Sequence, residues 1–324
     1  MKEIAVVLPV YNGMKYLSLA VESVLRQTHT DFIFLICDDC SKDGSWDYLN
    51  SIKDPRVSLF RNEVNRGLFP TLNFLCRKAD AKIIKLWSQD DIMNPECLAE
   101  TVAFHRKYPH ISFSYSDREH IDENGRHGAS ADLEDHTPEY IPRQLHDKIA
   151  LFTGSIAGNI ANVAIVKDKL EEAGYFDEGM IIAGDFDMWV KLTENYDTGR
   201  IPKPLIQLRD HSGQLSRSFE YYIRHIKEEK KVFSALFARV NGELRKFGKN
   251  NLRWRKNPLY FSFMLQAARR GKWGFVKEFS KELSEHDNLL GIAYRWSVIK
   301  LRKIFGIKLH KDNKFLFKER SQLN

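Results

Sequence analysis

Cysteine is scarce in this sequence, and its few positions do not form a recognisable disulfide or zinc pattern. The 324 residues contain four cysteines, too few for a disulfide framework, so we expect structural thiols. Cys37 and Cys40 have the spacing of a redox or zinc pair, but Asp38 and Asp39 lie between them and no second pair follows. A zinc site needs more ligands at tighter spacing, which argues against a zinc-bound module.

Long apolar runs are absent too. The longest, such as residues 32–37, are far too short to cross a bilayer. The chain starts directly with a strand pattern and shows no basic leader or cleavage site, so we expect a cytoplasmic protein. Repeats and low-complexity tracts are also missing. The hydrophobic content of 43% is that of a globular chain with one large domain or two smaller ones.

Charge is divided unevenly along the chain. Residues 1–220 hold 25 Lys and Arg against 34 Asp and Glu, whereas residues 221–324 hold 25 against 9. This split predicts two parts with different tasks, of which the second faces an anionic partner. The acidic first part would repel nucleic acid, and no nucleic-acid reader motif appears, so we expect no nucleic-acid partner.

Strand and helix patterns alternate through the first 120 residues, which predicts a doubly wound, mostly parallel α/β sheet. No G-x-G-x-x-G follows the first strand, which argues against a dinucleotide-binding unit. Residues 117–147 look polar and irregular, and the chain from 221 onward looks helical and basic. Strands are predicted at 4–10, 32–37, 57–61, 83–87, 111–115 and 161–166, and helices at 16–26, 46–52, 67–78, 170–173 and 185–194.

Polar side chains follow three of these strands and should meet at one edge of the sheet. Tyr11 offers a flat face to a base, Asp39 can accept from a ring N–H, and Asp90 can accept from ribose hydroxyls. Asp90 and Asp91 repel each other unless a cation or donors hold them, and a divalent ion carrying a diphosphate would do so. The alternative is ordinary turn chemistry, with Asp91 as the cap of a helix.

Seven segments resemble, in order and spacing, the inverting family 2 glycosyltransferases with the GT-A fold. The resemblance implies that residues 1–220 form a GT-A catalytic domain with nucleotide-sugar and acceptor halves, followed by a basic amphipathic helical region at 221–324. The matching segments are residues 9–13, 27–28, 38–45, 65–67, 90–91, 184–189 and 209–216.

The resemblance also assigns roles to matching positions. Asp91 and His211 would bind Mn²⁺ or Mg²⁺, and Arg209 would offset diphosphate charge, since arginine suits phosphate geometry. Asp90 would contact the ribose or diphosphate. The implied nucleotide-binding residues are Pro9, Tyr11, Asn12, Asp39, Arg66 and Asp90.

Asp185 matches the general base of the family, which takes the proton of the acceptor hydroxyl. Asp187 lies roughly 200° from it around the helix, so one carboxylate can face the cleft while the other caps or pairs. Both can instead be acids favoured at a helix N-terminus. We expect Trp189 in the core, with sugar stacking as the alternative.

Two of the positions that depart from the family pattern bear on the site. Gln89 stands two residues before Asp91, where the family often has an acid, which removes one candidate metal ligand. Gly184 stands before Asp185, where the family often has glutamate.

The implied function is metal-dependent, inverting transfer of a sugar, of the hexosyltransferase kind, from a nucleotide-diphosphate sugar, a UDP-sugar above all. The acceptor would be a hydroxyl of a glycan or polyprenyl-linked glycan in bacterial surface polysaccharide synthesis, such as lipopolysaccharide O-antigen or capsule. One alternative is a catalytically inactive sugar-nucleotide-binding scaffold on the membrane. Another is a nucleotidyltransferase, which usually has a glycine-rich basic loop that residues 12–15 do not provide.

The basic C-terminal part contains apolar stripes at helical spacing. Between residues 290 and 305 such a stripe lies beside Lys300, Arg302 and Lys303. These helices either pack on the catalytic domain or dock on the anionic inner face of the membrane as a peripheral protein. The stripe consists of Leu290, Tyr294, Val298, Leu301 and Phe305.

Overall fold

The computed structural model describes residues 1–127, 137–211, 219–285 and 287–305. Its contacts divide the chain into two compact units. The first comprises Met1–Leu133, Thr137–His146 and Ser155–His211, and the second comprises Glu134–His136, Asp147–Gly154 and Ser212–Asn324. The domain boundary predicted at residue 220 stays a proposal.

Within the described part of the first unit, nine strands form one sheet, in the order β3-β2-β1-β4-β8-β6-β9-β5 with β7 beside β9. Strands β1 to β4 run parallel, as does the long β6–β9 ladder, whereas β5, β7 and β8 pair in the antiparallel sense. The predicted fold class is confirmed. The strands are β1 (Lys2–Val10), β2 (Phe32–Asp38), β3 (Val57–Arg61), β4 (Ala81–Leu86), β5 (Ile92–Met93), β6 (Ile111–Ile121), β7 (Tyr140–Ile141), β8 (Val163–Val166) and β9 (Asp197–Arg209).

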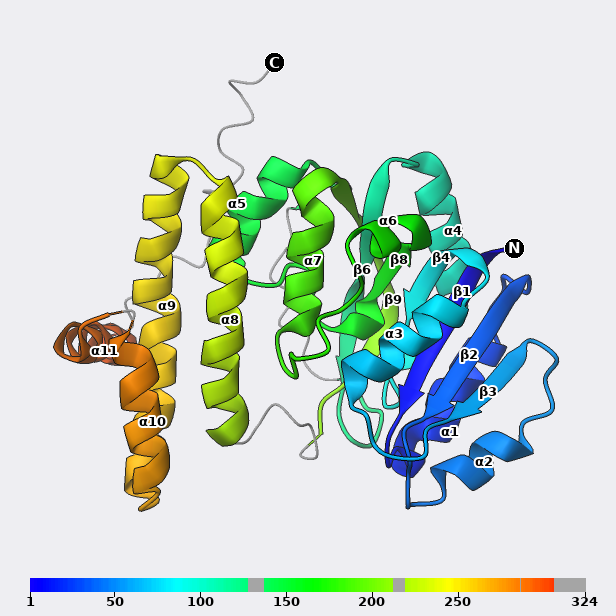
Figure 1. Ribbon diagram of the computed structural model, residues 1–324, viewed down its shortest axis with the longest axis horizontal. Coiled ribbons are helices and arrows are strands. Elements are labelled where there is room, and N and C mark those ends of the chain that lie inside the picture. Colours follow the sequence, from blue (N-terminus) through cyan, green and yellow to red (C-terminus); the bar gives the residue numbers. More distant parts are fainter. Residues whose placement is uncertain (128–136, 212–218, 286, 306–324) are drawn as a thin grey trace. The chain divides into compact units, whose positions relative to one another are not determined.

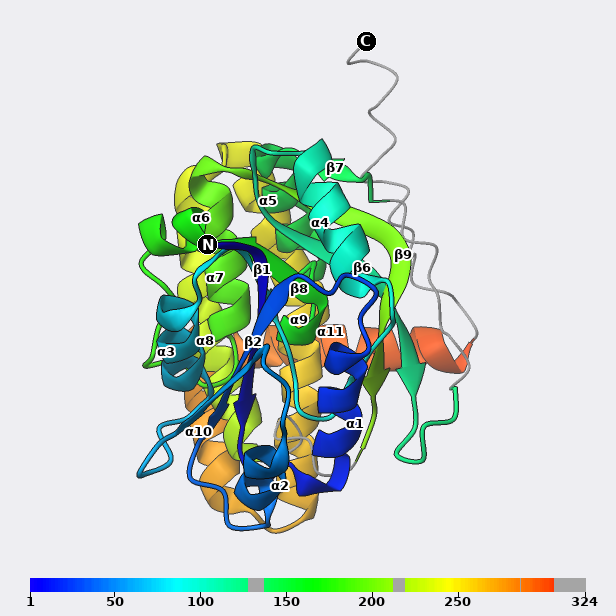
Figure 2. The same cartoon turned by 90° about the vertical axis from the view of Figure 1, so that its right-hand side faces the viewer.

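Helices cover both faces of this sheet (Figures 1 and 2). Helices α1, α2 and α4 lie on one face, and α3, α6 and α7 lie on the other. Their bounds are α1 (Met14–Leu25), α2 (Ser45–Ser51), α3 (Leu68–Lys78), α4 (Cys97–Lys107), α5 (Arg143–Thr153), α6 (Lys167–Glu172) and α7 (Gly184–Asn195), with a single 3₁₀ turn at Ile160–Asn162.

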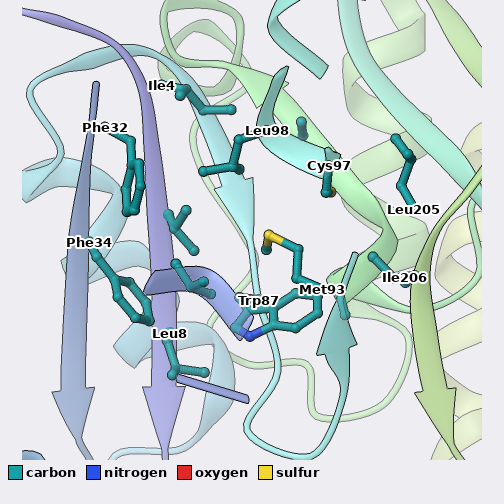
Figure 3. Packing of buried hydrophobic residues seen from close by; sticks show 14 of the residues in the cluster. Ile4, Leu8, Phe32, Phe34, Trp87, Met93, Cys97, Leu98, Leu205 and Ile206 are labelled. Carbon is teal, nitrogen blue, oxygen red and sulfur yellow. The ribbon is translucent and has the colours of Figure 1, made fainter. Parts of the chain in front are cut away.

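The main core lies between the sheet and the helices α1, α2 and α4. Alternate β1 side chains, among them Ile4 and Leu8, point into it because successive residues of a strand face opposite sides. Figure 3 shows these residues with Phe32 and Phe34 of β2 around the indole of Trp87, which is fully buried. Only Ser88 and Gln89 separate Trp87 from the acidic pair at 90–91, so the core helps to fix where that pair lies.

Most predicted elements are present, but the sequence patterns do not anticipate α4, β7, α5 and β9, all beyond residue 95. Helix α4 was not predicted. The prediction of an irregular stretch at 117–147 is wrong at both ends, because β6 continues to Ile121 and α5 begins at Arg143. Strand β9 is missed because Pro202 and Pro204 interrupt its pattern. The sheet accommodates them with a register shift opposite Asp117.

The second unit contains four helices in its described residues, joined by the last part of α5. The Asn251 side chain donates to the carbonyls of Leu151 (2.8 Å) and Phe152 (2.7 Å), and Arg239 pairs with Asp147. No helix in the described part of the chain is both long and apolar enough to span a membrane. The helices are α8 (Phe219–Arg239), α9 (Gly242–Arg269), α10 (Trp273–Ser284) and α11 (Leu289–Ile304).

Candidate active site

The candidate site lies where the strand order reverses, between β1 and β4. Strand β1 pairs with β2 on one side, with Val10 opposite Asp38, and with β4 on the other. The main chain of Asp39 donates to the Val10 carbonyl at 2.7 Å, which continues the pairing past the strand ends. Such a reversal opens a crevice at the carboxyl ends of the strands, where open α/β sheets bind ligands.

The turn after β1 is fastened to both neighbouring strand ends. The Gln89 side chain accepts from the main-chain N–H of Tyr11 (2.9 Å) and donates to its carbonyl (3.1 Å). On the other side, the N–H of Asn12 donates to the Ser41 hydroxyl at 2.9 Å. Tyr11, at 45% exposure, presents its ring to solvent from this fixed turn. Pro9, on β1, lies opposite Cys37.

Asp39 organises the loop before α3. Its carboxylate accepts from the Asn62 amide (2.7 Å) and from the main-chain N–H groups of Arg66 (2.9 Å) and Gly67 (2.8 Å). Gly67 has φ of +92°, which favours glycine. A carboxylate offers about four acceptor positions, so one remains for a ring N–H of a base. The predicted residue Arg66 thus takes part through its backbone, while its side chain is exposed.

The end of β9 brings His211 beside the acidic pair. Strand β5 pairs with β9, with Ile92 opposite Gln207, so the residues that follow β9 lie against those that precede β5. The His211 Nε2 atom lies 3.0 Å from Oδ2 of Asp90. Asp90 also accepts from the Ser88 hydroxyl through its other oxygen. The histidine predicted as a metal ligand therefore contacts Asp90.

Asp91 is turned into the protein and is 2% exposed. Its Oδ1 atom accepts from the N–H of Arg209 at 2.9 Å. Its Oδ2 atom is buried and has no hydrogen-bond partner among the described residues. Burial first, and the charge of Asp90 second, raise the pKa of Asp91 to about 7.

Arg209 links the acidic pair to a neighbouring hairpin. Its guanidinium donates to the carbonyls of Asp90 (3.0 Å) and Asp122 (3.1 Å) and lies 4.6 Å from the centre of the Tyr16 ring. The hairpin turns at residues 122–125, where Gly125 N donates to Asp122 O at 3.0 Å. Arg209 is 2% exposed, and these main-chain carbonyls accept its hydrogen bonds without neutralising its charge.

The residues around Asp90 fit a divalent cation only if other ligands complete the site. Among the described residues, no three His, Cys, Asp or Glu groups converge as a metal site. Asp90 and His211 together offer a carboxylate oxygen and an imidazole nitrogen, a pair that suits Mn²⁺ better than Mg²⁺, which prefers oxygen ligands. The buried Oδ2 atom of Asp91, the next residue in the chain, has no hydrogen-bond partner among the described residues. Phosphate oxygens of a bound nucleotide would supply the remaining ligands.

The two acids at the start of α7 differ in surroundings, as the helical spacing predicts. Asp187 pairs with Lys191 at 2.6 Å, one turn further along the helix. Asp185 is half-buried, and its Oδ1 atom accepts from the N–H of Phe186 at 2.7 Å. Trp189 is fully buried, as its predicted place in the core requires.

Gly184 allows α7 to pack closely on α3. A Cβ atom at this position would lie 2.5 Å from the ring of Phe69. That ring stacks on Phe176 at 5.5 Å, and Phe176 meets Trp189 edge-on. Because Gly67, which binds Asp39, directly precedes α3, the same short helix connects the Asp39 loop to the turn that carries Asp185.

Several contributors were not singled out from the sequence. Asn62 follows β3 directly, which is the same signal that pointed to Asp39 and Asp90. Phe69 and the clamp made by Gln89 depend on contacts between distant segments and leave no local pattern. The predicted segment at 214–216 lies outside the described residues.

Comparison with known sequences supports this description. Residues 5–164 match the model of the family described as glycosyl transferase family 2. Two relatives from Escherichia coli are described as UDP-Glc:alpha-D-GlcNAc-diphosphoundecaprenol beta-1,3-glucosyltransferases, WfaP and WfgD. They are 29% and 30% identical, over 36% and 37% of this chain and 46% and 47% of theirs. The chain therefore spans about half the length of the curated relatives it matches.

Solved structures share the fold. TarS 1-349 of S. aureus, in complex with UDP, matches with a TM-score of 0.63 at 16% identity, over 95% of this chain and 93% of that chain. The mannosyltransferase PcManGT from Pyrobaculum calidifontis, in complex with GDP-Man and Mn²⁺, matches with 0.56 at 14% identity, over 95% and 88%. The predicted GT-A fold is confirmed.

Replacing Gly184 with alanine should destabilise the protein by about 1 to 3 kcal/mol, because the added methyl group meets the Phe69 ring. The second change Phe69→Leu should recover part of this loss. Urea denaturation of the two single variants and the double variant measures the coupling between the positions. Strictly additive losses would show that the two side chains do not compete for the same space.

Asp91→Asn should remove a pH dependence of stability. Between pH 3.8, the ordinary pKa of the carboxyl group, and about pH 7, Asp91 of the unfolded chain loses a proton that folded Asp91 keeps. The free energy of unfolding therefore falls as pH rises, with a slope of at most about 1.4 kcal/mol per pH unit. Asparagine still accepts from Arg209 N but does not titrate. Denaturation curves with a chelator present would refute the raised pKa if both proteins showed the same slope.

Proposed function

Because the chain belongs to glycosyl transferase family 2, we propose that it transfers a sugar from a UDP-sugar to a hydroxyl group of a lipid-linked glycan. The names of the two E. coli relatives specify a UDP-glucose donor and a diphosphoundecaprenol acceptor. TarS has been crystallised with UDP-GlcNAc, and another E. coli relative is described as a putative colanic acid biosynthesis glycosyl transferase. These likenesses support a place in bacterial surface polysaccharide synthesis.

The observation that carries the proposal is the convergence at the switch point between β1 and β4. Hydrogen bonds between three strand ends and β9 hold Tyr11, the Asp39 carboxylate and the Asp90–His211 pair there. Tyr11 would stack on the base, and the open acceptor position of Asp39 would accept from its ring N–H. Asp90 and His211 would face the diphosphate.

We assign the divalent cation to Asp90 and His211 in preference to Asp91. Asp91 is almost fully buried and holds the main chain of Arg209, whereas the Asp90 and His211 side chains are partly exposed and 3.0 Å apart. When bound, Mn²⁺ or Mg²⁺ would supply positive charge against the donor diphosphate.

Asp185 is the proposed general base. It would accept the proton of the acceptor hydroxyl while that oxygen bonds to the anomeric carbon and the bond to the diphosphate breaks on the opposite face, which inverts the configuration. The first turn of a helix favours the carboxylate form. Asp187 forms an ion pair with Lys191, and we assign it no chemical role.

Asp185→Asn should lower sugar transfer by about 100- to 10,000-fold and leave binding of the UDP-sugar unchanged, since only the proton acceptor is lost. Transfer is measured as UDP release with a lipid-linked acceptor, and binding by calorimetry. Asp187→Asn, on the same helical turn, is the matched control and should stay active. Near-normal turnover of Asp185→Asn would overturn the assignment, and a wild-type protein that binds donors but never transfers would support the inactive scaffold.

We also propose that α11 attaches the protein to an anionic membrane surface. The predicted stripe faces away from the core of its unit, with Leu290 80%, Leu301 53% and Phe305 73% exposed. The opposite side of the helix, including Ile292 and Trp296, packs in that core instead. Exposed apolar residues bordered by lysine and arginine are typical of helices that lie in a membrane interface.

Leu301→Glu should weaken binding to vesicles containing anionic lipid by at least about tenfold, because it removes one apolar side chain from the interface and adds repulsion. Ser297→Glu, an exposed position on the same helix, adds the same charge without removing apolar surface. Sedimentation with vesicles compares the two. Equal losses in both variants would show that the apolar face makes no contact with lipid.

A further inference from the structure

The second unit contains a cavity that the proposed transfer does not use. It lies between α8 and α9, which run side by side in Figure 1, and its end reaches Leu283 of α10. Its volume is about 560 Å³, which falls within the range of sites for small ligands. We call it the α8–α9 cavity.

Helix α9 lines this cavity with four basic residues, and α8 lines it with apolar residues interspersed with Glu229, Lys230 and Ser234. The α9 wall carries Arg245, Lys249, Arg253 and Lys256, spaced by four, four and three residues, so that all four share one side of the helix. The α8 wall contributes apolar residues at similar spacing. They are Ile226, Phe233 and Phe237.

The acids of the cavity are already paired. Glu229 accepts from Lys256 Nζ (2.6 Å) and from the Tyr260 hydroxyl (2.6 Å), and Glu285 pairs with Lys230 at 2.6 Å. The other basic residues of the α9 wall, at 245, 249 and 253, are exposed to solvent and available to a ligand. No carboxylate among the described residues lies within ion-pair distance of them.

The three remaining cations make only weak contacts within the protein. Arg245 donates to the Val240 carbonyl at 3.2 Å, and the Lys249 ammonium lies 5.8 Å from the centre of the Phe237 ring. The Arg253 side chain is exposed to solvent. A row of three cations on an open wall attracts a ligand with several negative charges, and arginine matches the geometry of phosphate oxygens.

An apolar wall opposite a basic one requires a ligand with both characters. Free phosphate would leave the phenylalanine side chains in contact with water. A hydrocarbon alone would leave the three cations without an anionic partner. We propose that the α8–α9 cavity binds the diphosphate end of a lipid carrier, with the diphosphate on Arg245, Lys249 and Arg253 and the first part of the hydrocarbon chain against α8. The inference rests on the proposed function for the source of this ligand, the carrier of the acceptor.

Calorimetry with farnesyl diphosphate tests the proposal on the full chain, with UDP and Mg²⁺ present in excess to fill the active site. The triple variant Arg245→Gln, Lys249→Gln, Arg253→Gln should bind at least about tenfold more weakly, since each cation makes charged contacts with the diphosphate. Ser234→Trp should also abolish binding, because Ser234 is exposed and lines the cavity, where the larger ring would fill the space.

The matched control changes three exposed lysines outside the cavity, Lys231→Gln, Lys246→Gln and Lys277→Gln, and should keep the wild-type affinity. Equal losses in both triple variants would overturn the proposal in favour of general surface charge. Inorganic pyrophosphate that binds as tightly as farnesyl diphosphate would overturn the role of the chain. If the cavity triple variant bound anionic vesicles more weakly but kept its affinity for farnesyl diphosphate, the three cations would be assigned to bilayer lipid instead. Because no transfer is measured, these outcomes are independent of the proposed catalysis.

Discussion

The two hydrogen bonds between the Gln89 side chain and the main chain of Tyr11 connect the two halves of the site. They join the turn after β1 to the end of β4 across the point where the strand order reverses. Gly13 permits this, because a Cβ there would lie 2.5 Å from the Gln89 carboxamide. An acid at position 89 could accept from Tyr11 N but not donate to its carbonyl. The departure from the family pattern therefore exchanges a candidate metal ligand for a firmer connection.

The local sequence pattern was sufficient to predict the part of the site that follows strands β1 to β4. Strands β1 to β4 each carry a short apolar run that ends in polar residues, so their existence and their common edge follow from periodicity and from the rule for parallel sheets. Asp39 and Asp90 were placed in this way. The roles given to Asp185 and His211 came from the family resemblance, because a single acid or histidine in a loop has no local signal of its own.

What the sequence could not supply is the direction of individual side chains. Whether Asp90 or Asp91 faces the crevice depends on the pairing of β5 with β9, which brings Arg209 to Asp91 across 118 residues of chain. From the sequence alone, Gly184 is only a departure from the family pattern, because nothing local shows that a Cβ there would meet the Phe69 ring. Each of these depends on long-range packing, which no window of sequence contains.

Helix α11 shows a similar limit in the second unit, with a consequence for lipid recognition. Its apolar residues fall on two sides, one in the core with Ile292 and one exposed with Leu290 and Leu301, and periodicity alone cannot say which side packs. A convex exposed face touches many lipids weakly and has little chemical selectivity. A cavity with a fixed row of cations holds a single head group and can discriminate by charge. The two features are therefore complementary: α11 would keep the protein at the surface, where the α8–α9 cavity could select one carrier among many anionic lipids.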